Sequence, residues 1–74
     1  MRCYGYNKGT EAETPLELEE VTMQAGPDTL RAIARFLLHA AEQMELHGTK
    51  FGHEHFEDYC QRQADECRLI VSGE

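Results

Sequence analysis

The sequence predicts a small α+β domain of two layers, in which a sheet of about three strands is covered by one long amphipathic helix, in the order β-β-α-β. Three observations lead to it: alternating apolar residues from position 16, helically spaced apolar residues over 27–47, and a β-branched run at 69–71. A chain of 74 residues is one domain, 1–74. Because a domain this small buries only about 60% of its unfolded surface, we expect one modest core.

The helix is predicted from Pro27 to His47. Pro27 suits a first helical turn, where its missing N–H is not needed, and Gly26 can precede it as the N-cap. Gly48 can end the helix in a left-handed conformation. The apolar residues with the spacing of one helical face are Leu30, Ile33, Ala34, Leu37, Ala41 and Met44.

The apolar arc of this helix is wide. Phe36, Leu38 and Ala40 flank the main stripe, so the arc spans about 200° around the helix. Packing on a single sheet needs only about half of that arc. We therefore expect the helix to contact something beyond its own sheet, either a second copy of the chain in a homodimer or the loop that follows the helix.

Two strands are expected before the helix. Residues 16–19 alternate apolar and acidic side chains, and a β-bulge near Glu19 and Glu20 would keep Val21 and Met23 on the inner face. A first strand is expected over residues 2–6. The turn-forming residues 7–15 between the two strands predict a mobile loop that would close a hairpin.

The remaining strand is expected near the end of the sequence. Leu69, Ile70 and Val71 are apolar and mostly β-branched, and Ser72-Gly73 follows them. Residues 61–66 are polar and predict a loop before this strand.

Composition excludes several kinds of partner. The formal net charge is −7 and the isoelectric point is about 5.0. Nucleic acids and anionic membrane surfaces are bound by clustered Lys and Arg, so neither is expected here. A basic protein is the natural complement. Since no secretory signal and no apolar run of about 20 residues is visible, we expect the chain to stay in the cytoplasm.

Acidic residues concentrate in one stretch. Glu11, Glu13, Glu17, Glu19 and Glu20 lie within ten residues. Such a run is most simply a solvated strand face and loop. It can also steer a basic partner protein to this part of the surface.

The segment His53-Glu54-His55 is the sharpest local motif. In an extended chain both imidazoles point to one side, as a zinc site requires, and Cys60 and Cys67 could complete four ligands. The spacing matches no standard zinc site, and histidines in a loop more often bond to the backbone or cap a helix end. We therefore expect no bound metal and no cofactor. Three cysteines cannot all pair within one chain, and free thiols are ordinary in a reducing compartment.

Catalysis is not expected either. His53, Glu54, His55, Glu57 and Asp58 are acid–base groups close together in the sequence. The sequence shows no nucleophile framework and no glycine-rich phosphate loop to accompany them.

The string from Leu16 to Pro27, the helix that follows, and above all Phe51-Gly52-His53-Glu54-His55 resemble the immunity protein 32 family of bacterial polymorphic toxin systems. The resemblance covers roughly residues 15–71, including the closing strand. It implies a non-catalytic protein that binds a cognate toxin domain, expected to be basic, and occludes its active face.

The surface implied for that interaction combines the acidic strand face with the loop after the helix. The alternatives are a small metal-binding domain built on His53 and His55 and a structural homodimer. The residues expected to bind the partner are Glu17, Glu19, Glu20, Phe51, His53, Glu54, His55 and Phe56.

Overall fold

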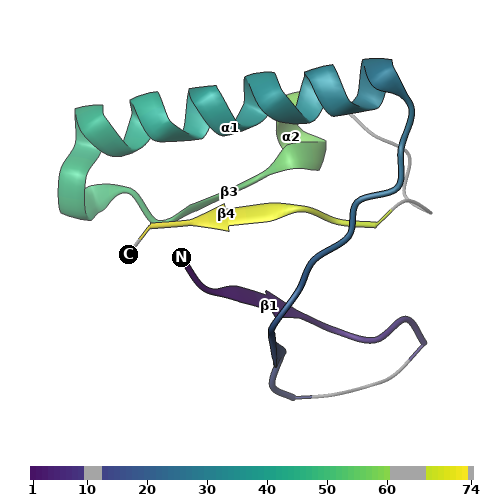
Figure 1. Ribbon diagram of the computed structural model, residues 1–74. Coiled ribbons are helices and arrows are strands. Elements are labelled where there is room, and N and C mark those ends of the chain that lie inside the picture. Colours follow the sequence, from purple (N-terminus) through teal and green to yellow (C-terminus); the bar gives the residue numbers. More distant parts are fainter. Residues whose placement is uncertain (10–12, 61–66, 74) are drawn as a thin grey trace.

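Helix α1 (Pro27–His47) forms one layer of the molecule, and two short antiparallel strand pairs lie on one side of it in the computed structural model (Figure 1). The structure describes residues 1–9, 13–60 and 67–73. In chain order the other elements are β1 (Cys3–Gly5), β2 (Leu16–Leu18), the 3-10 turn η1 (Gly48–Lys50), β3 (His53–His55), α2 (Phe56–Cys60) and β4 (Ile70–Ser72).

The predicted bounds of α1 are confirmed at both ends. Pro27 is the first helical residue, and the Leu30 N–H donates to the Gly26 carbonyl over 3.1 Å. At the other end Gly48 has a φ of 55°, and its N–H donates to the Met44 carbonyl. Local backbone chemistry, and not packing alone, therefore decides where this helix starts and stops.

Gly48 is a position where only glycine fits without strain. Replacing it with alanine is expected to lower the free energy of unfolding by about 1–2 kcal/mol, because a side chain disfavours a positive φ. Gly52→Ala is the matched control, since a Cβ there meets no atom within 4 Å and no positive φ is needed. Urea unfolding followed by circular dichroism measures both. Equal midpoints for the two variants would show that the α1 terminus does not depend on this conformation.

The α+β class is confirmed, and the strands are arranged differently from the single sheet of about three strands that the sequence predicts. β1 pairs with β2, and β3 pairs with β4, in two separate two-stranded sheets. The turn after α1 leads the chain straight back beneath the helix, which makes β3 the neighbour of β4. Two backbone bonds extend that ladder at its ends, from Phe56 N–H to Leu69 O (2.8 Å) and from Gly73 N–H to Gly52 O (3.2 Å).

The hairpin before α1 is confirmed, but it is shorter than predicted. Cys3 lies opposite Leu18, and Gly5 opposite Leu16. In this register all three residues of β1 pair with β2. Val21 and Met23, which follow β2, therefore have no strand opposite them. The bulge predicted near Glu19–Glu20 is therefore absent, and residues 20–26 carry no regular structure.

Two sequence predictions concern residues outside the described ranges. The mobile loop predicted over 7–15 includes residues 10–12, and the loop predicted over 61–66 lies wholly outside. Both stay predictions.

The core lies between α1 and the β3–α2–β4 unit. Phe36 is fully buried, and Phe56 is 4% exposed. Their rings meet with centroids 5.3 Å apart at 55°. The residues that line this core from α1 and from the opposite side are Ala32, Ile33, Cys60, Leu69 and Val71.

The buried face of α1 is therefore not the stripe with the most apolar residues. Ala32, Phe36 and Ala40 are buried, whereas Leu30 and Leu37 of the predicted stripe are 41% and 45% exposed. No helix in the part of the chain that the structure describes is long and apolar enough to cross a membrane.

Candidate partner-binding surface

The acidic run lies on and just after the hairpin strand β2. Glu17 stands opposite Tyr4 of β1, and both side chains are exposed. Glu19 and Glu20 follow β2 and are also exposed. We call Tyr4, Glu17, Glu19 and Glu20 the acidic hairpin surface. It combines carboxylates with an exposed aromatic ring, a residue type enriched where protein partners bind most strongly.

Strand β3 divides its side chains between two directions, as the alternation of an extended chain requires. Glu54 turns to α1, where the His39 Nε2 lies 3.1 Å from its carboxylate. The His39 ring also stacks on Tyr59 of α2, with centroids 5.0 Å apart and an interplanar angle of 26°. Three elements, α1, β3 and α2, thus meet through one histidine.

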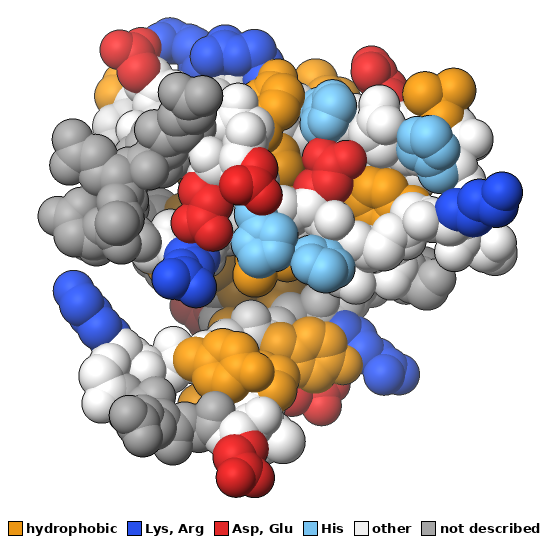
Figure 2. Space-filling model, turned by 180° about the vertical axis from the view of Figure 1, so that it is seen from behind, with side chains coloured by type: hydrophobic (Ala, Val, Ile, Leu, Met, Phe, Trp, Pro, Cys, Tyr) orange, Lys and Arg blue, Asp and Glu red, His pale blue; other side chains and the backbone are white. Residues whose placement is uncertain are grey.

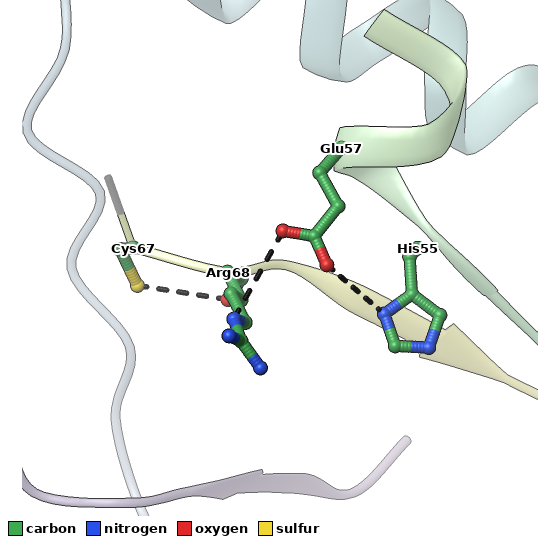
Figure 3. Close-up of polar contacts among 4 residues, drawn as sticks. All are labelled: His55, Glu57, Cys67 and Arg68. Carbon is green, nitrogen blue, oxygen red and sulfur yellow. Dashed lines mark hydrogen bonds and ion pairs between the residues drawn. The ribbon is translucent and has the colours of Figure 1, made fainter. Parts of the chain in front are cut away.

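The two outer histidines of β3 form a second group, and Figure 3 shows the contacts of one of them, His55. His53 and His55 meet edge to face with ring centroids 5.1 Å apart. The His55 Nδ1 lies 3.5 Å from the Glu57 carboxylate, whose other oxygen lies 4.0 Å from the Arg68 Nε. Glu57 therefore stands between a histidine and an arginine, and links α2 to the chain just before β4.

These groups surround a shallow hollow of about 380 Å³. We call its lining the histidine surface, which consists of His39, His53, Glu54, His55, Asp58 and Tyr59. The imidazoles and carboxylates are about one third exposed where they pair, so water and a partner protein can reach them. Polar contacts this accessible contribute at most about 1 kcal/mol to folding, which leaves these side chains available to exchange bonds with a partner.

The metal-ligand candidates of the sequence do not come together. Cys60 is half buried beside the core, and the Cys67 thiol is exposed and donates to the Arg68 carbonyl over 3.6 Å. Within residues 1–9, 13–60 and 67–73, no three His, Cys, Asp or Glu side chains are grouped so that they could hold a metal ion. The edge-to-face histidine pair alone supplies too few ligands for a structural zinc site.

The two phenylalanines of the predicted surface have different positions. Phe56 belongs to the core, so its side chain is not available to a partner in this structure. Its place is explained by the change from β3 to α2, which turns this residue inward beneath Phe36. Phe51 is half buried, and a Cβ added at Gly73 would lie 3.2 Å from its ring. The Phe51 ring therefore packs against the end of β4, and only part of it is accessible to a partner.

The histidine surface lies next to the hairpin. Figure 1 places the hairpin beside the β3–β4 sheet, away from α1. From behind, Figure 2 shows the histidine side chains among carboxylates, directly above the hairpin with its hydrophobic side chains. One partner could therefore contact both surfaces at once.

Two residues of this region were missed in the sequence. His39 falls in the narrow polar strip of α1, and Tyr59 follows the motif without any pattern of its own. A usable signal exists for His39: in an extended His53–His55 segment, Glu54 faces away from the histidines, toward the covering helix.

The comparisons with known proteins give one match. The family model described as immunity protein 32 matches residues 20–73. The matched region includes α1 and the whole histidine surface, and of the acidic hairpin surface it includes Glu20 alone. No curated protein and no solved structure was found to be similar to the chain.

Proposed function

The chain belongs to the immunity protein 32 family, and from that membership we propose that it binds and neutralises a cognate toxin domain of a bacterial polymorphic toxin system. The family implies an immunity role and a toxin partner in general terms. Our proposal adds a direct, stoichiometric complex in the cytoplasm of the producing cell, formed without any catalytic step by the chain itself.

The mechanism we propose is occlusion of the toxin's active face. The net charge of −7 and the exposed carboxylates of the hairpin suit a basic toxin surface. Long-range attraction of this kind speeds encounter, and Tyr4 beside Glu17 supplies apolar contact area after docking. If the toxin acts on nucleic acid, the carboxylates would occupy the place of the substrate phosphates.

The histidine surface would provide the directional bonds of the complex. Its imidazoles can donate or accept, and its carboxylates accept, in a hollow wide enough to receive one or two side chains of a partner. The observation that carries the proposal is the family match across this surface. The chemistry of half-exposed His–Glu pairs supports a binding role, since it offers exchangeable bonds at low folding cost.

Co-expression with the proposed cognate toxin domain tests the proposal. We expect the toxin domain alone to stop growth of the host and the chain to restore it. A tagged chain should then co-purify with the toxin in equimolar amount. Growth arrest that persists at full expression of the folded chain would contradict the proposal, and growth restored without a complex would contradict occlusion as the mechanism.

A further inference from the structure

The outer side of α1 carries an apolar stripe that the fold leaves uncovered. Leu38 is 66% exposed, and Leu30 and Leu37 are each more than 40% exposed. Ala34 and Ala41 are exposed between them. With 3.6 residues per turn these five residues lie on one face, opposite the buried Ala32–Phe36–Ala40 face. We call Leu30, Ala34, Leu37, Leu38 and Ala41 the outer stripe.

The molecule as a whole exposes more surface than a monomer of its size normally does. Its accessible area is 6764 Å². A folded monomer of 8.5 kDa is expected to expose about 4,700 Å². The difference of about 2,000 Å² exceeds the roughly 800 Å² that each partner buries in a standard interface. The exposed area is therefore large enough for an interface of standard size in addition to a toxin contact at the hairpin.

The charges beside the outer stripe indicate what covers it. Arg31 and Arg35 lie in the first half of α1, and Glu42 and Glu45 lie in the second half, all exposed. Arg31, Arg35 and Glu42 fall within about 40° of one another around the helix, and Glu45 lies next to the position of Leu38. Arg31 also pairs with Asp28 over 3.2 Å. The first end of this edge therefore carries two arginines and one aspartate, with a net positive charge, and the second end is acidic.

This pattern is complementary to itself when the second helix runs in the opposite direction. A two-fold axis perpendicular to two antiparallel helices brings the same edge of both together, with the first half of one beside the second half of the other. Arg31 and Arg35 then face Glu45 and Glu42 of the second copy, at both ends of the interface. Parallel helices related by a two-fold axis along their length would place this edge of each helix beside the opposite edge of the other, so these charges would not pair.

We propose that two copies of this chain form a dimer through antiparallel packing of their α1 helices on the outer stripe, with Leu38 near the two-fold axis. The acidic hairpin surface lies beyond the β3–β4 sheet, on the side away from α1 (Figure 1). The dimer therefore leaves both hairpins free and can hold one toxin domain on each. This inference goes beyond the proposed function and does not depend on it.

Charge exchange tests the direction and the register of the pairing. In Arg31→Glu/Arg35→Glu all four exchanged positions are negative, and in Glu42→Arg/Glu45→Arg all four are positive, while Asp28 beside Arg31 is unchanged in both. Each variant alone is expected to be a monomer of 8.5 kDa by light scattering, and an equimolar mixture to form the dimer again. The fourfold variant that carries both exchanges should dimerise by itself. A mixture that stays monomeric although both variants keep the helical circular dichroism of the native chain would overturn the proposal.

A matched pair of leucine substitutions tests the stripe itself. Leu38→Lys places two ammonium groups near the two-fold axis and is expected to weaken dimerisation at least tenfold. Leu46→Lys changes the same residue type on the same helix, 73% exposed and off the stripe, and should leave the dimer intact. A native chain that is monomeric at about 1 mM, where an association with a micromolar dissociation constant is nearly complete, would overturn the dimer. If Leu38→Lys then also loses toxin binding, the stripe belongs to the toxin contact.

Discussion

Phe36→Ala is expected to destabilise the fold by about 3–5 kcal/mol, because Phe36 is the largest fully buried side chain of the described residues. Phe36 is fully buried and meets the rings of Phe56 at 5.3 Å and Tyr59 at 5.7 Å. It joins α1 to α2, so its loss opens a cavity where three elements meet. A domain of 74 residues has a total stability of about 4–11 kcal/mol, so much of the variant would be unfolded at 37 °C.

Urea unfolding at fixed protein concentration measures this effect, with Leu46→Ala as the matched control. Leu46 lies on the same helix, 73% exposed, and is expected to change the free energy of unfolding by less than about 0.5 kcal/mol. A Phe36→Ala variant with the midpoint of the control would show that the core does not lie between α1 and α2.

Charge reversal of the hairpin is expected to have the largest effect on function. In Glu17→Lys/Glu19→Lys/Glu20→Lys the acidic hairpin surface becomes basic, and a basic toxin domain would be repelled. We expect the association rate at low ionic strength to fall at least about tenfold and protection of the cell to be lost. All three side chains are exposed, so the fold should keep its stability. Stopped-flow or surface-based association kinetics with the purified toxin domain measures the effect.

A neutral variant and a control separate local charge from net charge. Glu17→Gln/Glu19→Gln/Glu20→Gln removes three negative charges from the hairpin. Leu46→Lys/Thr49→Lys/Glu45→Gln makes the net charge more positive by the same three units at exposed positions on α1 and η1. We expect slower association for the hairpin variant and a much smaller change for the control. Equal association rates for both variants would contradict the hairpin as the docking surface.

The elements that could be predicted from the sequence are those whose structure is determined by neighbouring residues. The bounds of α1 follow from Pro27 and Gly48, which act through their own φ angles and backbone groups, whatever the rest of the chain does. The hairpin of β1 and β2 was likewise predictable from alternation over neighbouring residues. The family was recognisable from the Phe51–His55 string, and the family match includes that string.

Contacts between residues far apart in the sequence could not be predicted from the sequence. The width of the apolar arc of α1 does not show which part of the arc is buried. Ala32 and Ala40 are buried because their small side chains allow β3 and α2 to approach the helix closely. The pairing of β3 with β4 depends on the path of the turn after α1, which three residues of alternation cannot reveal. His39 becomes part of the histidine surface only through Glu54, fifteen positions away.

We propose that this chain inactivates a toxin by binding it directly, and the most direct measurement is the residual activity of the purified cognate toxin domain as the purified chain is added in increasing amount. We expect this activity to fall linearly and to reach its minimum at one chain per toxin domain. The charge-reversed hairpin variant should require a large excess. Toxin activity that stays unchanged at several equivalents of the native, folded chain would contradict it.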